Sequence, residues 1–153
     1  MTDLEGMQAA LDEARAAEAA GEVPIGAVVL FDGGIIARGQ NRVLRDNDPT
    51  AHAEMVALRA AALAIGNYRL AGCTLVSTLE PCAMCAGAMI HARIHRLVFA
   101  ADDPKAGAAG SALGVLNHAA LNHQMVLERG LLAEESTALL REFFQRRRSL
   151  PKA

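Results

Sequence analysis

Apolar residues along this 153-residue chain change several times between helical spacing and short strand-like runs. Leu4, Met7 and Leu11 recur at helical spacing, whereas 25–31 is a strand-like apolar run followed by a hairpin turn at Asp32-Gly33-Gly34. Helices that fall between strands favour an α/β sandwich with a partly parallel sheet. The pattern predicts helices over 3–20, 48–65, 81–91 and 133–148, strands over 25–31, 35–39, 73–79, 96–101 and 125–128, and a loop over 102–111.

Turn-forming residues mark the ends of the two central helices. We expect Asp48 or Thr50 to cap the second helix, which ends at Gly66-Asn67, and Pro81 suits the first turn of the third. This third helix is small and apolar on every side from Cys82 to Ile90. A helix without a polar face is buried on both sides, so we expect it in the core or under a second subunit.

Length and composition predict one domain over residues 1–153 and no membrane span. Hydrophobic residues make up 52% of the chain and charged residues 21%, which is too apolar for disorder. No apolar run reaches the roughly 18 residues of a transmembrane helix. The acidic start, Met1 to Glu5, lacks the basic-then-apolar order of a signal peptide and predicts a cytoplasmic protein. Three cysteines, an odd number, favour a metal or a reactive thiol over a disulfide framework.

Two short stretches carry the candidate chemistry, His52-Ala53-Glu54 and Pro81-Cys82-Ala83-Met84-Cys85. Cysteines three apart at a helix start lie on neighbouring turns and can bind one ion, and the helix N-terminus favours the thiolate. Three interpretations are open: a thioredoxin-like redox pair, half of a structural zinc site, or a catalytic zinc site completed by His52. The redox pair gives His52 and Glu54 no role. The only other cysteine, Cys73, lies at the far end of the preceding strand, roughly 20 Å away.

The spacing of His52 and Glu54 favours the catalytic zinc site. Residues two apart on a helix point roughly 200° apart, so both can approach only a site off the helix end. His52, Cys82 and Cys85 would supply three ligands and leave a fourth position open, which a hydrolytic zinc site needs. Glu54 would then stand back as a proton carrier. Its ordinary alternative is an acid favoured near a helix N-terminus by the helix dipole.

These stretches together resemble the His-x-Glu…Pro-Cys-x-x-Cys signature of the zinc nucleobase deaminases. The chain is also similar to the family of bacterial tRNA-specific adenosine deaminases from about residue 5 to 148, and departs from it at Val76, where that family is expected to have Tyr. The stretches that carry this resemblance are Glu22–Val28, Asn41-Arg42, Asp48–Glu54, Asn67–Leu70, Thr78–Ile90 and Asp103–Ala108.

The resemblance implies a cytidine deaminase-like fold, a three-layer α/β/α sandwich with a mixed five-stranded sheet. It implies hydrolytic deamination of adenosine to inosine at the wobble position of a tRNA anticodon, with one Zn²⁺ per chain on His52, Cys82 and Cys85 and with Glu54 as the catalytic residue. The expected partners are a tRNA anticodon loop and a second copy of the chain in a homodimer, without membrane or nucleotide cofactor. Two alternatives are a deaminase of a free guanine- or cytosine-type base or nucleoside, and a non-catalytic zinc or redox RNA-binding module.

The resemblance also implies contacts with the substrate. Asn41 would read the purine edge, Asp103 and Lys105 would reach the anticodon nucleotides, and Asn122 would contact flanking RNA. We also expect backbone N–H groups around Ala53 to donate to the developing oxygen. The ordinary alternatives are a turn residue for Asn41 and solvated loop charges for Asp103 and Lys105.

The end of the chain is locally basic although the formal net charge is −2. We expect a basic helix over about 133–148, in which Phe143 is core and a partly exposed Phe144 stacks on a splayed loop base. Arg147 and Arg148 would contact phosphates. An ordinary amphipathic helix end is the alternative, and an enzyme acting on a free base does not need this arrangement. The basic residues are Arg141, Arg146, Arg147, Arg148 and Lys152, against Glu142.

Overall fold

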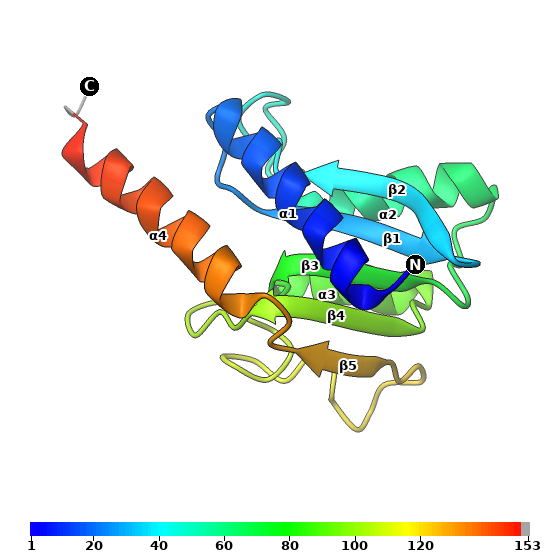
Figure 1. Cartoon of the computed structure of the whole chain (residues 1–153). Helices are drawn as coiled ribbons and strands as arrows, with labels where there is room; N and C mark the ends of the chain where they lie inside the picture. Colours follow the sequence, from blue (N-terminus) through cyan, green and yellow to red (C-terminus); the bar gives the residue numbers. More distant parts are fainter. Residues whose placement is uncertain (151–153) are drawn as a thin grey trace.

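The computed structural model describes residues 1–150, and 151–153, with Lys152, lie outside the described residues. Each expected helix and strand is present in the expected order (Figure 1). The elements are α1 (Asp3–Ala19), β1 (Gly26–Phe31), β2 (Gly34–Gln40), α2 (Ala53–Ile65), β3 (Thr74–Leu79), α3 (Ala83–Ala92), β4 (Arg96–Ala101), β5 (Val126–Arg129) and α4 (Ala133–Ser149).

The strands form one mixed sheet in the order β2-β1-β3-β4-β5. Strand β1 is antiparallel to both β2 and β3, whereas β3, β4 and β5 are parallel to one another. Helices α1 and α4 cover one face of the sheet, and α2 and α3 cover the other (Figure 1). The predicted three-layer α/β/α sandwich with a mixed five-stranded sheet is therefore confirmed.

The central strands are buried on both faces because their side chains alternate between two apolar cores. One row of cross-strand neighbours packs with α1, and the next row packs with α2 and α3. The first row is Val28, Val76 and Val98, and the second is Val29, Leu75 and Leu97. This arrangement fixes α2 and α3 together on one face of the sheet.

The predicted cap of α2 is wrong. The N-cap residue is His52, whose side chain makes no capping hydrogen bond. The Asp48 carboxylate instead accepts hydrogen bonds from the backbone N–H of Thr50, at 2.8 Å, and from its hydroxyl, at 2.7 Å, within the preceding turn. Helix α2 ends as expected at Gly66, which is left-handed with φ of 77°. The imidazole of His52 is thus not used by its own helix.

Helix α3 starts later than predicted and is covered on one side only. Its N-cap is Cys82, so Pro81 precedes the helix rather than forming its first turn. Cys85, Ala86 and Met89 are buried against the sheet and α2. The opposite side has an exposed Ala83 and half-buried apolar residues, so burial within the chain's own core is wrong for this side. Its burial under a second subunit stays a prediction. Among residues 1–150, no helix is long and apolar enough to cross a membrane.

Candidate active site

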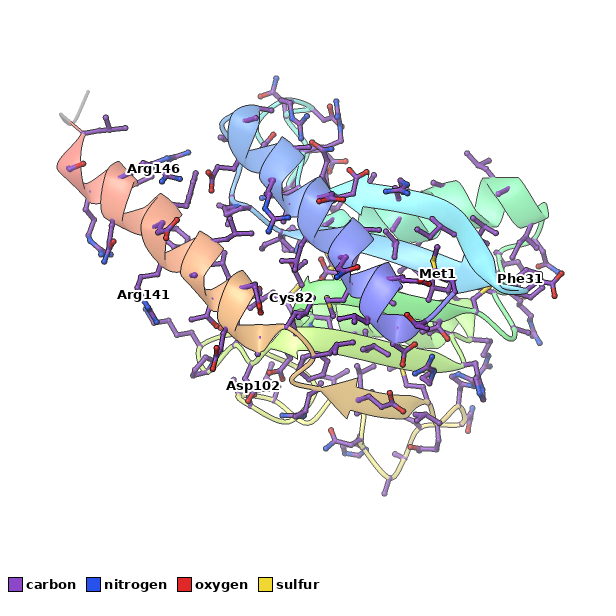
Figure 2. The ribbon with its side chains drawn as sticks, in the orientation of Figure 1. Met1, Phe31, Cys82, Asp102, Arg141 and Arg146 are labelled. Atoms are coloured by element: carbon purple, nitrogen blue, oxygen red, sulfur yellow. The ribbon has the colours of Figure 1, made fainter. Side chains whose placement is uncertain are left out.

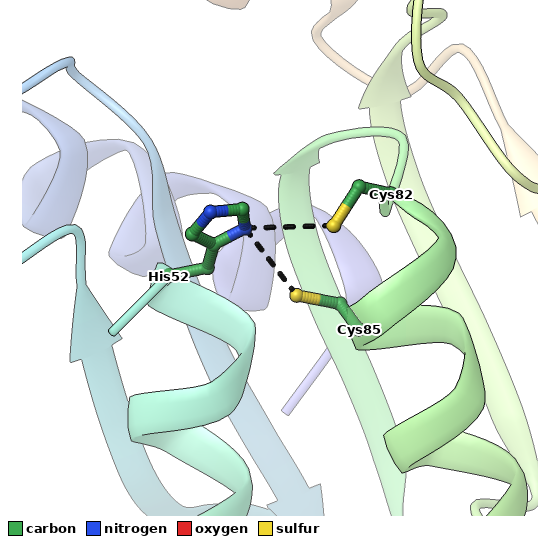
Figure 3. Close-up of side chains that lie close together, drawn as sticks. All are labelled: His52, Cys82 and Cys85. Atoms are coloured by element: carbon green, nitrogen blue, oxygen red, sulfur yellow. Dashed lines mark hydrogen bonds between the residues drawn. The ribbon is translucent and has the colours of Figure 1, made fainter. Parts of the chain in front are cut away.

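The starts of α2 and α3 bring three metal-ligating side chains together. The Nδ1 atom of His52 lies 3.5 Å from the Sγ of Cys82 and 3.6 Å from the Sγ of Cys85. Figure 3 shows the imidazole ring and both sulfur atoms pointing toward one another between the two helix starts. His52 reaches this position because α2 and α3 pack on the same face of the sheet and contact each other.

These three donors fit a zinc ion. Zn–S bonds of about 2.3 Å and Zn–N bonds of about 2.0 Å in a tetrahedral site put ligand atoms about 3.5–3.8 Å apart. The observed nitrogen–sulfur separations match, and all three ligand atoms lie within 4.8 Å of one another. Cys73 precedes β3, at the opposite end of that strand from Cys82, so it is not a fourth ligand. The chain thus provides a site with three protein ligands for one Zn²⁺.

In the absence of a metal ion, the charges of the cluster favour the metal-binding form of Cys82. Hydrogen bonds from the Cys85 thiol and from His52 lower the pKa of Cys82 to about 3, so this cysteine is a thiolate at neutral pH. The hydrogen bond with Cys82 raises the pKa of His52 in turn. The hydrogen bond with Cys82 and burial raise the pKa of Cys85, and the negative charges of Glu54 and Cys82 act in the same direction.

Glu54 lies in the first turn of α2, next to this cluster. The residue is only 4% exposed. Burial, the largest effect, raises its pKa to about 7, although its own backbone N–H and His52 act in the opposite direction. A carboxyl group that titrates near neutral pH can both accept and donate a proton under physiological conditions.

A cavity of about 200 Å³ opens beside the imidazole ring. Its lining is mostly apolar, and the one side-chain amide in it belongs to Asn41. Asn41 is 9% exposed, and its Oδ1 accepts the backbone N–H of Val43 at 3.4 Å. An apolar cavity with few convergent polar groups is typical of a small-molecule or base-binding pocket. The lining residues are Val23, Ile25, Asn41, His52 and Ala53.

Comparison with known proteins gives consistent matches across the chain. The family model of the cytidine and deoxycytidylate deaminase zinc-binding region matches residues 1–101, which include the cluster and Glu54. The chain is 50% identical to the tRNA-specific adenosine deaminase of Haemophilus influenzae over 98% of this chain and 87% of that protein. It is 45% identical to the enzyme of the same name from Bacillus subtilis, over 96% and 91% respectively. The chain belongs to the tRNA-specific adenosine deaminase family.

Solved structures agree with this family assignment. A structure from a study of A-to-I editing by tRNA:A34 deaminases at the wobble position matches with a TM-score of 0.86 and 46% identity, over 89% of this chain and 99% of that one. A guanine deaminase from Nitrosomonas europaea matches with a TM-score of 0.80 but only 31% identity, over 92% and 83%. The fold and the zinc site are thus those of the wider deaminase group, and the higher identity lies on the tRNA side.

Two buried carboxylates that were not among the predicted site residues hold loops of this deaminase through backbone hydrogen bonds. Glu22 is 1% exposed and accepts the backbone N–H groups of Leu44, at 3.1 Å, and Arg45, at 2.9 Å, and the Arg45 Nε, at 3.1 Å. Burial raises the pKa of Glu22, but these hydrogen bonds outweigh it and lower the pKa below its ordinary 4.5. Glu80, which is 2% exposed, holds the 103–111 loop in the same way, by accepting the backbone N–H groups of Asp103, Ala109 and Ser111. For both residues, the sequence feature that could have predicted a buried carboxylate is an acidic residue within an otherwise apolar stretch.

The predicted RNA-contact residues fall in three places. Asp103 caps its own loop by accepting the backbone N–H groups of Lys105, at 3.1 Å, and Ala106, at 3.2 Å. Lys105 is exposed. This loop contacts the start of α3 through a hydrogen bond from the Ala108 N–H to the Pro81 carbonyl, at 2.8 Å. The roles of Asp103 and Lys105 stay predictions.

Asn122 lies apart from the cluster. It lines a second cavity, of about 400 Å³, with Tyr68, Arg93 and neighbouring residues beside the C-terminal end of α3. The cysteines stand at the N-terminal end of the same helix, and ten residues of helix span about 15 Å. A contact between Asn122 and RNA stays a prediction, and it would lie well away from the reacting base.

The last helix of this deaminase extends beyond the sheet, and Arg141 and Arg146 project from different sides of it (Figure 2). As expected, Phe143 is buried, at 7% exposure, and Phe144 is not, at 44%. Arg147 already has partners within the chain, since its guanidinium lies 5.1 Å from the Phe143 ring centroid and donates to the Gly21 carbonyl at 3.3 Å.

Arg148 is exposed near the end of the same helix. The predicted contacts of Phe144, Arg147 and Arg148 with RNA are untested.

Proposed function

We propose that the protein deaminates adenosine at the wobble position of a tRNA anticodon, producing inosine and ammonia. The observation that carries this proposal is the 50% identity to a tRNA-specific adenosine deaminase over nearly the whole of both chains. The His52–Cys82–Cys85 cluster and the buried Glu54 beside a small apolar cavity support it. A base enters such a pocket only when it is single-stranded or flipped out, which an anticodon loop allows.

In this mechanism His52, Cys82 and Cys85 hold the zinc ion, which when bound supplies Lewis-acid activation of a water molecule. Glu54 would accept one proton from the attacking water at its carboxylate and pass it to ring N1. It would then accept the remaining proton of the oxygen added at C6 and pass it to the exocyclic amine, which leaves as ammonia while that oxygen becomes the carbonyl oxygen of inosine.

Residues that line the cavity orient the base in this proposal. The Asn41 amide hydrogen bonds to the purine edge, and the backbone N–H of Ala53 donates to the new oxygen at C6. The nearly complete burial of Asn41 supports its role, because a fixed amide selects one orientation of the base.

Outside the pocket, Asp103, Lys105 and Asn122 contact RNA, Phe144 stacks on a splayed base, and Arg147 and Arg148 contact phosphates. The exposure of Phe144 next to a run of three arginines supports an RNA substrate over a free base.

We also propose that two copies of the chain form a homodimer in the cytoplasm. The half-exposed apolar side of α3, which includes Gly87 and Ile90, supports a contact with a second copy. Light scattering on the purified protein tests it, and a monomeric mass at micromolar concentration would contradict it.

The decisive test of the function is incubation of the zinc-loaded protein with an anticodon stem-loop that carries adenosine at the wobble position. We expect inosine in the digested RNA by mass spectrometry, and none when adenosine is moved one position in the loop. Conversion of free guanine or cytosine without conversion of the RNA would favour the free-base alternative instead.

Glu54→Gln tests the proton carrier within the same assay. The variant should keep one zinc per chain and lose about 10²- to 10⁴-fold in rate, because general acid–base catalysis contributes about that much. Glu134→Gln is the matched control, since Glu134 is an exposed first-turn acid of α4. Loss of zinc from Glu54→Gln would show that Glu54 holds the metal site together rather than moving protons.

A further inference from the structure

The carboxylate of Glu80 is the hub of a hydrogen-bond network beside the zinc site. It lies immediately after β3, two residues before Cys82, and is 2% exposed. Its Oε1 accepts the backbone N–H of Asp103 at 3.0 Å and the hydroxyl of Ser111. Its Oε2 accepts the backbone N–H groups of Ala109, at 2.9 Å, and Ser111, at 3.2 Å. One side chain thus fixes both ends of the 103–111 loop.

The loop is wrapped closely around this carboxylate. A methyl group on Gly107 would come within 2.6 Å of the Glu80 Oε1, so only glycine fits there. The chain on either side of the Glu80 side chain is also tied to this region, since the Glu80 N–H donates to the Ala101 carbonyl at 2.9 Å and the Pro81 carbonyl accepts the Ala108 N–H at 2.8 Å.

A loop without regular secondary structure must satisfy its backbone N–H groups elsewhere, and here Glu80 satisfies three of them. Hydrogen bonds to an ionised group are stronger than neutral ones, and this group is screened from water. The ends of the loop, at Asp103 and at Ala109 and Ser111, are held by Glu80, whereas Lys105 between them is exposed. The loop is therefore ordered before any ligand arrives.

We propose that Glu80 is a positioning residue for RNA recognition, which holds the 103–111 loop in its binding conformation beside the zinc-binding turn. This inference rests on the proposed function, because RNA is the ligand that the loop would meet. A pre-ordered loop loses less conformational entropy on binding, so Glu80 acts on substrate affinity and not on the chemical step. Glu80 itself does not contact the substrate or the zinc ligands' sulfur atoms in this scheme.

Glu80→Gln is the main test, because it keeps the size of the side chain and replaces one acceptor oxygen with an NH₂ group that faces N–H donors. Amide hydrogen exchange should rise by about tenfold or more at Asp103, Ala109 and Ser111. KM for the anticodon stem-loop should rise by about tenfold, with kcat within about threefold and with one zinc per chain. Glu22→Gln is the matched control, since it should raise exchange at 44–45 but not at 103–111.

Gly107→Ala is a second variant. It keeps the Glu80 residue itself, but its added methyl group collides with the Glu80 carboxylate and pushes the loop and the carboxylate apart. It should shift exchange and KM in the same direction, and it decides the question if Glu80→Gln does not fold. Unchanged exchange at 103–111 in both variants would overturn the inference. So would raised exchange with an unchanged KM, or a loss of zinc, which would place the effect of Glu80 on the metal site instead of the loop. If the wild-type protein makes no inosine, the proposed function fails, while the exchange arm still decides whether Glu80 holds the loop.

Discussion

Substitution of Gly39 by Ala should damage the zinc site although Gly39 touches none of its ligands. Gly39 lies in β2, where α2 packs on the sheet with its backbone in direct contact with the glycine. A methyl group there would lie 2.6 Å from the backbone nitrogen of Ala57 and closer still to the carbonyl oxygen of Ala53. Neither backbone atom can rotate away, so α2 itself must move.

The size of the displacement follows from these contacts. Ordinary van der Waals contact begins at 3.4 Å, so the start of α2 must move by at least about 0.8 Å to relieve the contact with Ala57, and by more to relieve the closer one with Ala53. His52 directly precedes the helix and moves with it. Zinc sites tolerate deviations of about 0.2 Å in ligand distances, so a displacement of this size should weaken zinc binding by tenfold or more. Overpacking should also lower the free energy of unfolding by about 1–3 kcal/mol.

Zinc competition with a chromophoric chelator, together with urea unfolding of the metal-free protein, measures both effects. Gly34→Ala is the matched control, because Gly34 lies in the same strand and a methyl group there meets nothing within 4 Å. Equal zinc affinities for the two variants would refute the argument that close approach at Gly39 sets the position of His52.

Further variants test the metal ligands, the acid stability and the last helix. Cys85→Ser should lower zinc content well below one per chain by plasma mass spectrometry, whereas Cys73→Ala, at the other end of β3, should retain it. Because the folded-state pKa of Glu22 lies below 4.5, its contribution to stability is present above about pH 4.5 and is lost as the pH falls through the folded-state value. Urea unfolding from pH 7 to pH 3 should therefore show a smaller acid loss for Glu22→Gln than for wild type, and equal slopes would contradict this account. Phe143→Ala should cost about 3 kcal/mol in urea unfolding because the ring is buried. Phe144→Ala should cost little stability but weaken binding of the anticodon stem-loop, and the reverse pattern would mean that the RNA-facing side of α4 is wrongly assigned.

The sequence was sufficient to predict the elements, the layers and the zinc-binding residues. Apolar spacing is a local property, so the ranges of the helices and strands could be found one segment at a time. His52, Cys82 and Cys85 could be found because zinc accepts few side-chain types and the cysteine spacing fits one helix start. The burial of Phe143 and the partial exposure of Phe144 were also predicted and are confirmed.

The tertiary structure alone determined the side-chain roles that depend on hydrogen-bond or packing partners distant in the sequence. Asp48 was a reasonable cap by its residue type, but the chain placed it in a separate turn and left His52 at the helix start. Glu22 and Glu80 are ordinary acids in sequence and become buried anchors only because loops 22 to 31 residues away supply N–H groups to them. The sides of α3 are equally apolar in sequence. Only its packing against the sheet and α2 determines which side is buried. Residue type limits what a side chain can bond, but only the folded chain determines which of those bonds are within reach.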